Sequence, residues 1–217
     1  MAIEDALGRV LTVYWNEIWP ALDGERRETL ADLLRQLARQ ASGQDPGEDA
    51  AGQIILQIVR ILRRVLPRDH PARDELEWGS RLATGTRPDW GQLTVALRSL
   101  TALITREQVR SRLLQAPMMS ADEVRARGED PGRRFLIRLD PGTGEHRFPA
   151  FQFGPDGNVI GLVLDVNKRL GSDDDPWGAA DWWLGKNAWL NGVPADLIGH
   201  DDRSVLDAAD AVNAEEW

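Results

Sequence analysis

The side chains that most often carry chemistry are sparse and scattered in this sequence. His70, His146 and His200 lie far apart and show no metal-ligand spacing. The chain has no cysteine, which excludes disulfides and thiolate metal sites. It also lacks a Gly-x-Ser-x-Gly nucleophile motif. We therefore expect a protein that is not an enzyme and that holds no metal and no cofactor.

Two short motifs could be taken for chemical sites. The run Asp173-Asp174-Asp175 could hold a hard cation, but aspartates that precede a helix more often cap it. Gly142-Thr143-Gly144 is followed by a strand pattern and not by a helix. It therefore predicts a hairpin turn and not a phosphate-binding loop.

The net charge of the chain lies at one end. Residues 171–217 contain two basic residues, Lys186 and Arg203, and eleven acidic ones, a net charge of −9 that equals that of the whole chain. Such an end repels nucleic acid and attracts a basic protein partner. A solvated acidic surface that aids solubility is the alternative.

Tryptophan is concentrated in the same part of the chain. Four of the nine tryptophans lie between residues 177 and 189. Large aromatic side chains either build a dense core or anchor a protein interface. Both interpretations apply to this segment.

The first half of the chain shows apolar residues at helical spacing, which predicts a helical bundle over residues 1–116. The first helix begins at Ile3 and is expected to end at Pro20. A polar loop is expected over residues 42–49, and a capping box at Thr105 and Gln108 is expected to open the last helix. The expected helical segments are 3–18, 30–37, 54–65, 71–83, 93–104 and 105–115.

Residues 117–158 predict one short helix followed by a β-hairpin. Ser120 and Glu123 form a capping-box pattern. A first strand is expected over residues 135–139, where apolar and polar side chains alternate, and a second over 146–153. Pro149 places the second strand at an edge or ends it early.

The last segment, 159–217, predicts a small helical domain. Gly171 closes a first helix, and Asp175 caps a second one that starts at Pro176 and ends at Gly185. Asn191-Gly192 predicts a turn. The expected helical segments are 159–170, 176–184, 194–198 and 204–212.

The order of these motifs resembles a known family. The run from Arg147 to Phe153 reads Arg-Phe-Pro-Ala-Phe-Gln-Phe and is followed by a glycine turn and a helix. Then come Asp175-Pro176-Trp177, Trp183-Leu184, Asn187, Leu190-Asn191-Gly192, Pro194 and Asp196-Leu197-Ile198. This succession resembles the toxin-binding domain of the Xre/MbcA/ParS antitoxin family over roughly residues 117–217.

The resemblance implies a binding protein that neutralises a RES-domain toxin, an enzyme that degrades NAD. It also implies that the chain could self-associate and bind its own operator. We assign partner binding to Trp182, Asn187, Trp189, Leu190, Gly192, Pro194 and Trp217. We assign a structural role to Phe148, Pro149, Phe151, Gln152, Phe153, Trp177, Trp183, Leu184 and Leu197.

The DNA-binding part of the family pattern is incomplete. Residues 120–127 can supply the first helix of a helix-turn-helix, but residues 128–132 leave little room for a recognition helix. The side chains that could contact phosphates are Arg125, Arg127, Arg133 and Arg134. A DNA-binding regulator acting through residues 117–153 is therefore an alternative function.

The helix over residues 176–184 cannot bury all its indoles on one neighbour. At 100° per residue, Trp177, Ala180, Trp183 and Leu184 share one stripe, while Trp182 points away from it. Trp182 packs on another element or faces a partner. Trp217, the last residue, is either disordered or inserted into a toxin pocket.

Taken together, the sequence predicts a mainly α protein in three parts: a helical bundle over 1–116, a degenerate winged helix-turn-helix-like part over 117–158, and a helical toxin-binding-like domain over 159–217. No signal peptide or membrane span is visible, so we expect a cytoplasmic protein. A further alternative is an adaptor, with the first part recruiting another protein and the tail serving oligomerisation.

Overall fold

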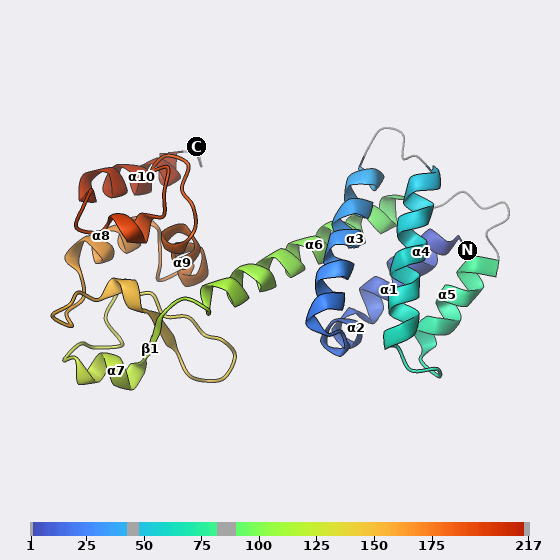
Figure 1. Ribbon diagram of the computed structural model, residues 1–217, viewed down its shortest axis with the longest axis horizontal. Helices are drawn as coiled ribbons and strands as arrows, with labels where there is room; N and C mark the ends of the chain where they lie inside the picture. Colours follow the sequence, from blue (N-terminus) through green and yellow to red (C-terminus); the bar gives the residue numbers. More distant parts are fainter. Residues whose placement is uncertain (1, 43–47, 82–89, 215–217) are drawn as a thin grey trace. The chain divides into compact units, whose positions relative to one another are not determined.

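The computed structural model describes residues 2–42, 48–81 and 90–214 of the chain. The protein is mainly helical with one small antiparallel sheet, which confirms the predicted fold class (Figure 1). The chain divides into two compact units, an N-terminal unit of residues 1–106 and a C-terminal unit of residues 107–217. The division falls inside a helix and not after residue 116. None of the described helices is long and apolar enough to cross a membrane.

The N-terminal unit is a helical bundle around one apolar core. Within it, α1 packs against α5 and α3 packs against α4. Leu30 and Leu34 of α3 and Ile55 and Ile58 of α4 are fully buried, because apolar residues at this spacing share one helix face. The helices are α1 (Ile3–Val13), α2 (Trp15–Ala21), α3 (Gly24–Ala41), α4 (Glu48–Val65), α5 (Pro71–Arg81) and α6 (Trp90–Leu113), the last of which continues into the C-terminal unit.

The first predicted helix is two helices. The backbone leaves the helical conformation at Tyr14, with φ −109° and ψ 11°, and α2 starts at the next residue. Pro20 lies inside α2, so the prediction that it ends the pattern is wrong by one residue. A proline here removes only one hydrogen bond, and the helix ends directly after it at Ala21.

The helices expected over residues 93–104 and 105–115 form one continuous helix, α6. The predicted capping box at Thr105 and Gln108 is therefore wrong. No glycine or proline lies between Gly91 and Pro117, so no residue interrupts the helical hydrogen bonds. The polar loop is shorter than predicted because α4 begins at Glu48, and residues 43–47 lie outside the described part.

The C-terminal unit is built from short elements. Its larger core surrounds Trp183 and unites residues of α8, α9 and α10, and its smaller core surrounds Phe148. The elements after α6 are β1 (Met118–Ser120), α7 (Ala121–Ala126), β2 (Arg147–Pro149), the 3-10 helix η1 (Ala150–Gln152), α8 (Gly161–Arg169), α9 (Pro176–Leu184), the 3-10 helix η2 (Pro194–Leu197) and α10 (Asp202–Ala214).

The capping box that opens α7 is formed as predicted. The Ser120 hydroxyl accepts a hydrogen bond from the Glu123 N–H at 3.2 Å, and the Glu123 carboxylate accepts one from the Ser120 N–H at 2.7 Å. These bonds, led by the backbone one, lower the pKa of Glu123 from its ordinary value. The two reciprocal hydrogen bonds therefore stabilise the first turn of α7.

The strand predicted over residues 135–139 is not formed. Phe135 has a φ of +62°, which no extended strand allows, and both Leu136 and Ile137 are buried where a strand would alternate. Of the hairpin, only a bridge between Leu139 and Arg147 remains. The β2 strand instead pairs with β1, which the sequence did not predict, and ends at Pro149.

Candidate protein-binding site

The C-terminal unit is centred on a buried polar network. The indole nitrogen of Trp183 donates a 2.7 Å hydrogen bond to Oδ1 of Asn167. Nδ2 of Asn167 lies 3.3 Å from Oε1 of Gln152. All three side chains are fully buried. The network therefore joins η1, α8 and α9, three consecutive elements of the chain.

The same network holds the loop that replaces the predicted strand. Gln152 pairs with the backbone of Ile137 through both ends of its amide, at 2.8 and 3.1 Å. Asn167 donates to the carbonyl oxygen of Phe135 at 2.8 Å. Because buried polar groups must find partners, these bonds fix one conformation of the loop.

Asn167 is the residue that the sequence analysis missed. It follows Val166 and lies one helical turn after Val163, on the apolar stripe of α8. A polar residue on an apolar stripe is a signal for a buried hydrogen-bonding role. Its two side-chain partners, Trp183 and Gln152, could be identified only from the structure.

The start of α9 is formed as predicted. The Asp175 carboxylate accepts a 2.9 Å hydrogen bond from the Gly178 N–H, and Pro176 occupies the first turn. On this helix Trp183 and Ala180 are fully buried, whereas Trp177 and Leu184 are only partly buried. Trp177 lies under the guanidinium of Arg110, 4.9 Å from the ring centre.

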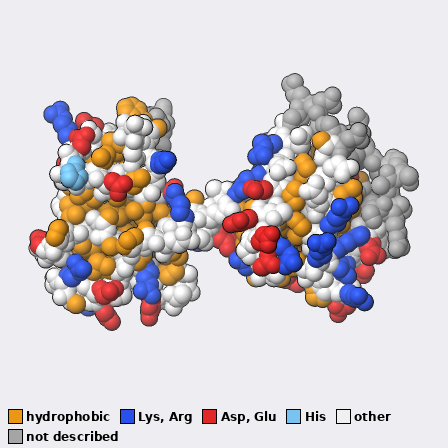
Figure 2. Space-filling view, viewed as in Figure 1, with side chains coloured by type: hydrophobic (Ala, Val, Ile, Leu, Met, Phe, Trp, Pro, Cys, Tyr) orange, Lys and Arg blue, Asp and Glu red, His pale blue; other side chains and the backbone are white. Residues whose placement is uncertain are grey.

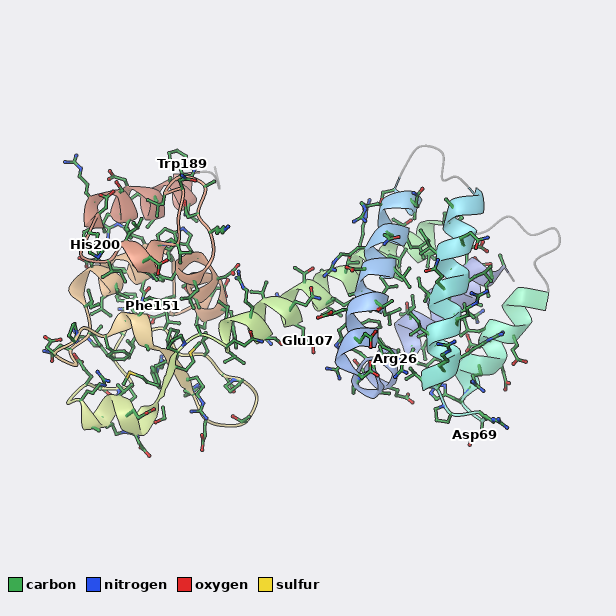
Figure 3. All side chains as sticks on the ribbon, in the orientation of Figure 1. Arg26, Asp69, Glu107, Phe151, Trp189 and His200 are labelled. Carbon is green, nitrogen blue, oxygen red and sulfur yellow. The ribbon has the colours of Figure 1, made fainter. Side chains whose placement is uncertain are left out.

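Trp189 is the most exposed large apolar side chain of the described part, at 75%. The side chain of Asn187 holds its turn, because Oδ1 accepts hydrogen bonds from the N–H groups of Trp189 and Leu190 at 2.9 and 3.2 Å. Backbone hydrogen bonds between Asn187 and Gly192 close the turn, with Asn191 at φ +47°. A fixed backbone therefore presents an indole to solvent at the edge of the unit (Figure 3).

Trp182 is partly buried and packs edge-on against Trp183, with ring centres 5.2 Å apart. Its indole nitrogen is buried and has no hydrogen-bond partner among the described residues. Such a group costs about 1–3 kcal/mol of stability. The sequence left open whether Trp182 packs internally or faces a partner: its ring packs internally against Trp183, and its nitrogen stays unpaired among the described residues.

Hydrophobic side chains gather on one face of the C-terminal unit (Figure 2). Phe151 is partly buried and lies 5.2 Å from the Trp183 ring, centre to centre. Apolar surface gathered on one face of a small unit is typical of a protein-binding surface.

The remaining motif residues lie mainly inside the unit. Phe148 and Phe153 belong to the smaller core, and Pro149 is buried at the end of β2. Pro194 is buried at the start of η2, and Leu197 packs partly against the larger core. Gly192 contributes backbone to the Trp189 turn. Trp217 lies outside the described residues.

Three of the four arginines considered for DNA contact form ion pairs with nearby carboxylates. Arg125 pairs with Asp122 at 2.6 Å, and Arg133 pairs with Glu129 at 2.9 Å. Arg134 pairs with Asp173 at 3.1 Å. Arg127 is exposed, with its stem near Gly157. Between Arg127 and His146 no residue is helical, so this fully described stretch offers no recognition helix.

The aspartates that precede α9 act on the backbone. Asp173 accepts a 3.0 Å hydrogen bond from the Phe135 N–H, and Asp175 caps α9. Within the described residues no group of three metal-ligating side chains comes together. The capping interpretation therefore holds for Asp175, whereas Asp173 binds the distant Phe135 backbone instead of capping a helix.

The N-terminal unit has a groove of about 810 Å³ lined by α1 and by the first part of α6. Val13, Val95 and Leu103 line it and are 60%, 66% and 51% exposed. Polar side chains such as Glu4 and Asn16 also belong to its lining. The helix α6 thus has a second apolar face besides the one in the core.

Comparisons of the chain with protein-family models, curated proteins and solved structures found no match. The assignment of a function therefore depends on the residues of the chain itself.

Proposed function

We propose that this protein is a non-catalytic, antitoxin-like inhibitor that binds a protein toxin through its C-terminal unit. The observation that carries the proposal is the turn that presents Trp189. An indole that is 75% exposed on a fixed turn loses little conformational entropy on binding and buries a large area. Tryptophan is one of the residues most enriched in interface hot spots.

The apolar side chains gathered on one face of the C-terminal unit (Figure 2) support the same role, because apolar surface suits the core of a protein interface. The acidic composition of residues 171–217 favours a partner with a basic surface. Charge complementarity of this kind accelerates association and selects the partner.

We infer a RES-domain, NAD-degrading toxin as the partner from the resemblance to the Xre/MbcA/ParS antitoxins. The motif residues that carry this resemblance belong to one compact unit, and Gln152 and Trp183 share the buried network with Asn167. A folded unit of this kind is what a toxin-binding module requires.

The test co-expresses the chain with the product of the adjacent gene, which we expect to be the RES-domain toxin. Wild type should restore growth and cellular NAD and should co-elute with the toxin in size-exclusion chromatography. Trp189→Ala should lose this protection. Leu56→Ala, which removes another exposed apolar side chain in the N-terminal unit, is the matched control and should protect as wild type does.

An adaptor role is a second candidate, favoured by the groove along α1 and α6. Its exposed valines and leucine suit the apolar face of a partner helix. Val95→Asp should then abolish capture of such a partner but leave toxin neutralisation unchanged. If Val95→Asp captures it as wild type does, the groove does not carry the role.

A further inference from the structure

A pocket of about 540 Å³ lies beside Trp182 in the C-terminal unit. The end of α6 contributes Arg112 to its lining, α9 contributes Asp181 and Trp182, and the following loop contributes Lys186 and Asn187. Asn187 is also the residue that holds the Trp189 turn. The pocket and the exposed indole are therefore connected by one side chain.

The pocket is rich in hydrogen-bond donors. The indole N–H of Trp182 has no acceptor in the described part of the chain, whereas that of Trp183 is bound to Asn167. Asn187 already uses its Oδ1 on the turn, so the group it has left is its donating Nδ2. A ligand with acceptor atoms matches these donors.

The pocket is also positively charged in an acidic part of the chain. Lys186 is one of only two basic residues in residues 171–217. Arg112 brings a second cation and forms an ion pair with Asp181. Two cations and one carboxylate leave the lining with a net charge of +1, which favours an anionic ligand.

We propose that this pocket binds the carboxylate of an acidic side chain on the partner protein, an inference that depends on the proposed function for the source of that carboxylate. The carboxylate pairs with the Lys186 ammonium and the Arg112 guanidinium, and it lies beside the Trp182 ring that lines the same pocket. Partner contacts then continue from this pocket across Asn187 to Trp189.

The first experiment needs no partner. Acetate is titrated into the full chain, with acetamide as its neutral analogue, and the indole N–H signals are followed by ¹⁵N NMR. The Trp182 signal is assigned by its loss in Trp182→Phe. We expect it to shift saturably with acetate and not with acetamide, and we expect Lys186→Gln to weaken acetate binding while Lys168→Gln, the other lysine of the chain, does not. An absent shift, or equal shifts with both probes, overturns the carboxylate site.

The second experiment uses the toxin complex. Lys186→Glu should weaken it by about tenfold or more, and Lys168→Glu should leave it within about twofold. A complex that Lys186→Glu does not weaken contradicts the pocket inference and leaves the proposed function intact. If wild type forms no complex, the proposed function fails, while the acetate titration still decides whether the pocket takes a carboxylate.

Discussion

The indole nitrogen of Trp183 donates a 2.7 Å hydrogen bond to the side-chain oxygen of Asn167, and both residues are fully buried. Gln152 joins them from η1, so one polar network connects three separate stretches of the C-terminal unit. A buried network of this kind stabilises a fold only if every member keeps its partners. The unit that presents Trp189 therefore depends on these three side chains.

Breaking this network should destabilise the C-terminal unit. Asn167→Ala removes the acceptor of Trp183 and a partner of Gln152, and it leaves buried polar groups unpaired, so we expect a loss of about 2–4 kcal/mol. Urea unfolding followed by tryptophan fluorescence and circular dichroism measures it. Trp177→Phe, at a partly buried tryptophan of the same region, should cost about 1 kcal/mol or less. Equal losses in the two variants would contradict the role of the network.

The aspartates before α9 should differ in their contributions. Asp175→Ala removes the cap of α9 and should cost about 1 kcal/mol, and Asp173→Ala should cost a similar amount because it releases the Phe135 N–H. Asp174→Ala is the matched control, since its carboxylate has no such contact in the described ranges, and its effect should stay within about 0.5 kcal/mol. Thermal unfolding of the three variants compares them. Equal effects in all three variants would indicate that the negative charge of these residues, and not their hydrogen bonds to the backbone, sets the stability.

Gly185 is required by close approach and not by a left-handed backbone. Its φ is −90°, but an added Cβ would lie 2.6 Å from the carbonyl oxygen of Asp181. Gly185→Ala should therefore destabilise the unit by about 1–3 kcal/mol in urea unfolding. Gly161→Ala, in the first turn of α8 with open space around it, should be neutral or slightly stabilising. A neutral Gly185→Ala would show that the α9 end relaxes easily.

The capping box of α7 should respond to acid. Folding lowers the pKa of Glu123, chiefly through the hydrogen bond from the Ser120 N–H, so its contribution to stability is present above the unfolded value of about 4.3. That contribution is lost as the pH falls through the lower folded value. Glu123→Gln should flatten the pH dependence of stability below about pH 4.3. An unchanged acid limb in Glu123→Gln would show that the carboxylate is not coupled to folding.

Local signals in the sequence predicted the helices well. Asp175 with Pro176 fixed the start of α9, and Ser120 with Glu123 fixed that of α7, because these bonds span only three residues. The capping pattern at Thr105 gave a wrong helix start. Residues 92–104 contain neither glycine nor proline, so α6 continues through Thr105. A cap pattern marks a helix start only where the preceding chain can leave the helix.

Long-range contacts explain what the sequence could not reveal. The alternation over residues 135–139 predicted a strand, but bonds from Asp173, Asn167 and Gln152 hold this stretch as a loop. β1 and β2 are separated in the chain by α7 and this loop, so no local signal predicts their pairing. The site was predicted in part: the exposure of Trp189 follows from its turn, whereas the unpaired nitrogen of Trp182 depends on three-dimensional packing.

The central claim is that the C-terminal unit binds the toxin through Trp189. The most direct measurement is calorimetric titration of the full chain with a catalytically inactive form of the adjacent-gene toxin. Trp189→Ala should weaken binding by about 30-fold, the equivalent of about 2 kcal/mol, while Leu56→Ala stays within about twofold of wild type. An affinity that Trp189→Ala leaves unchanged, or a wild-type chain that does not bind, would contradict the claim.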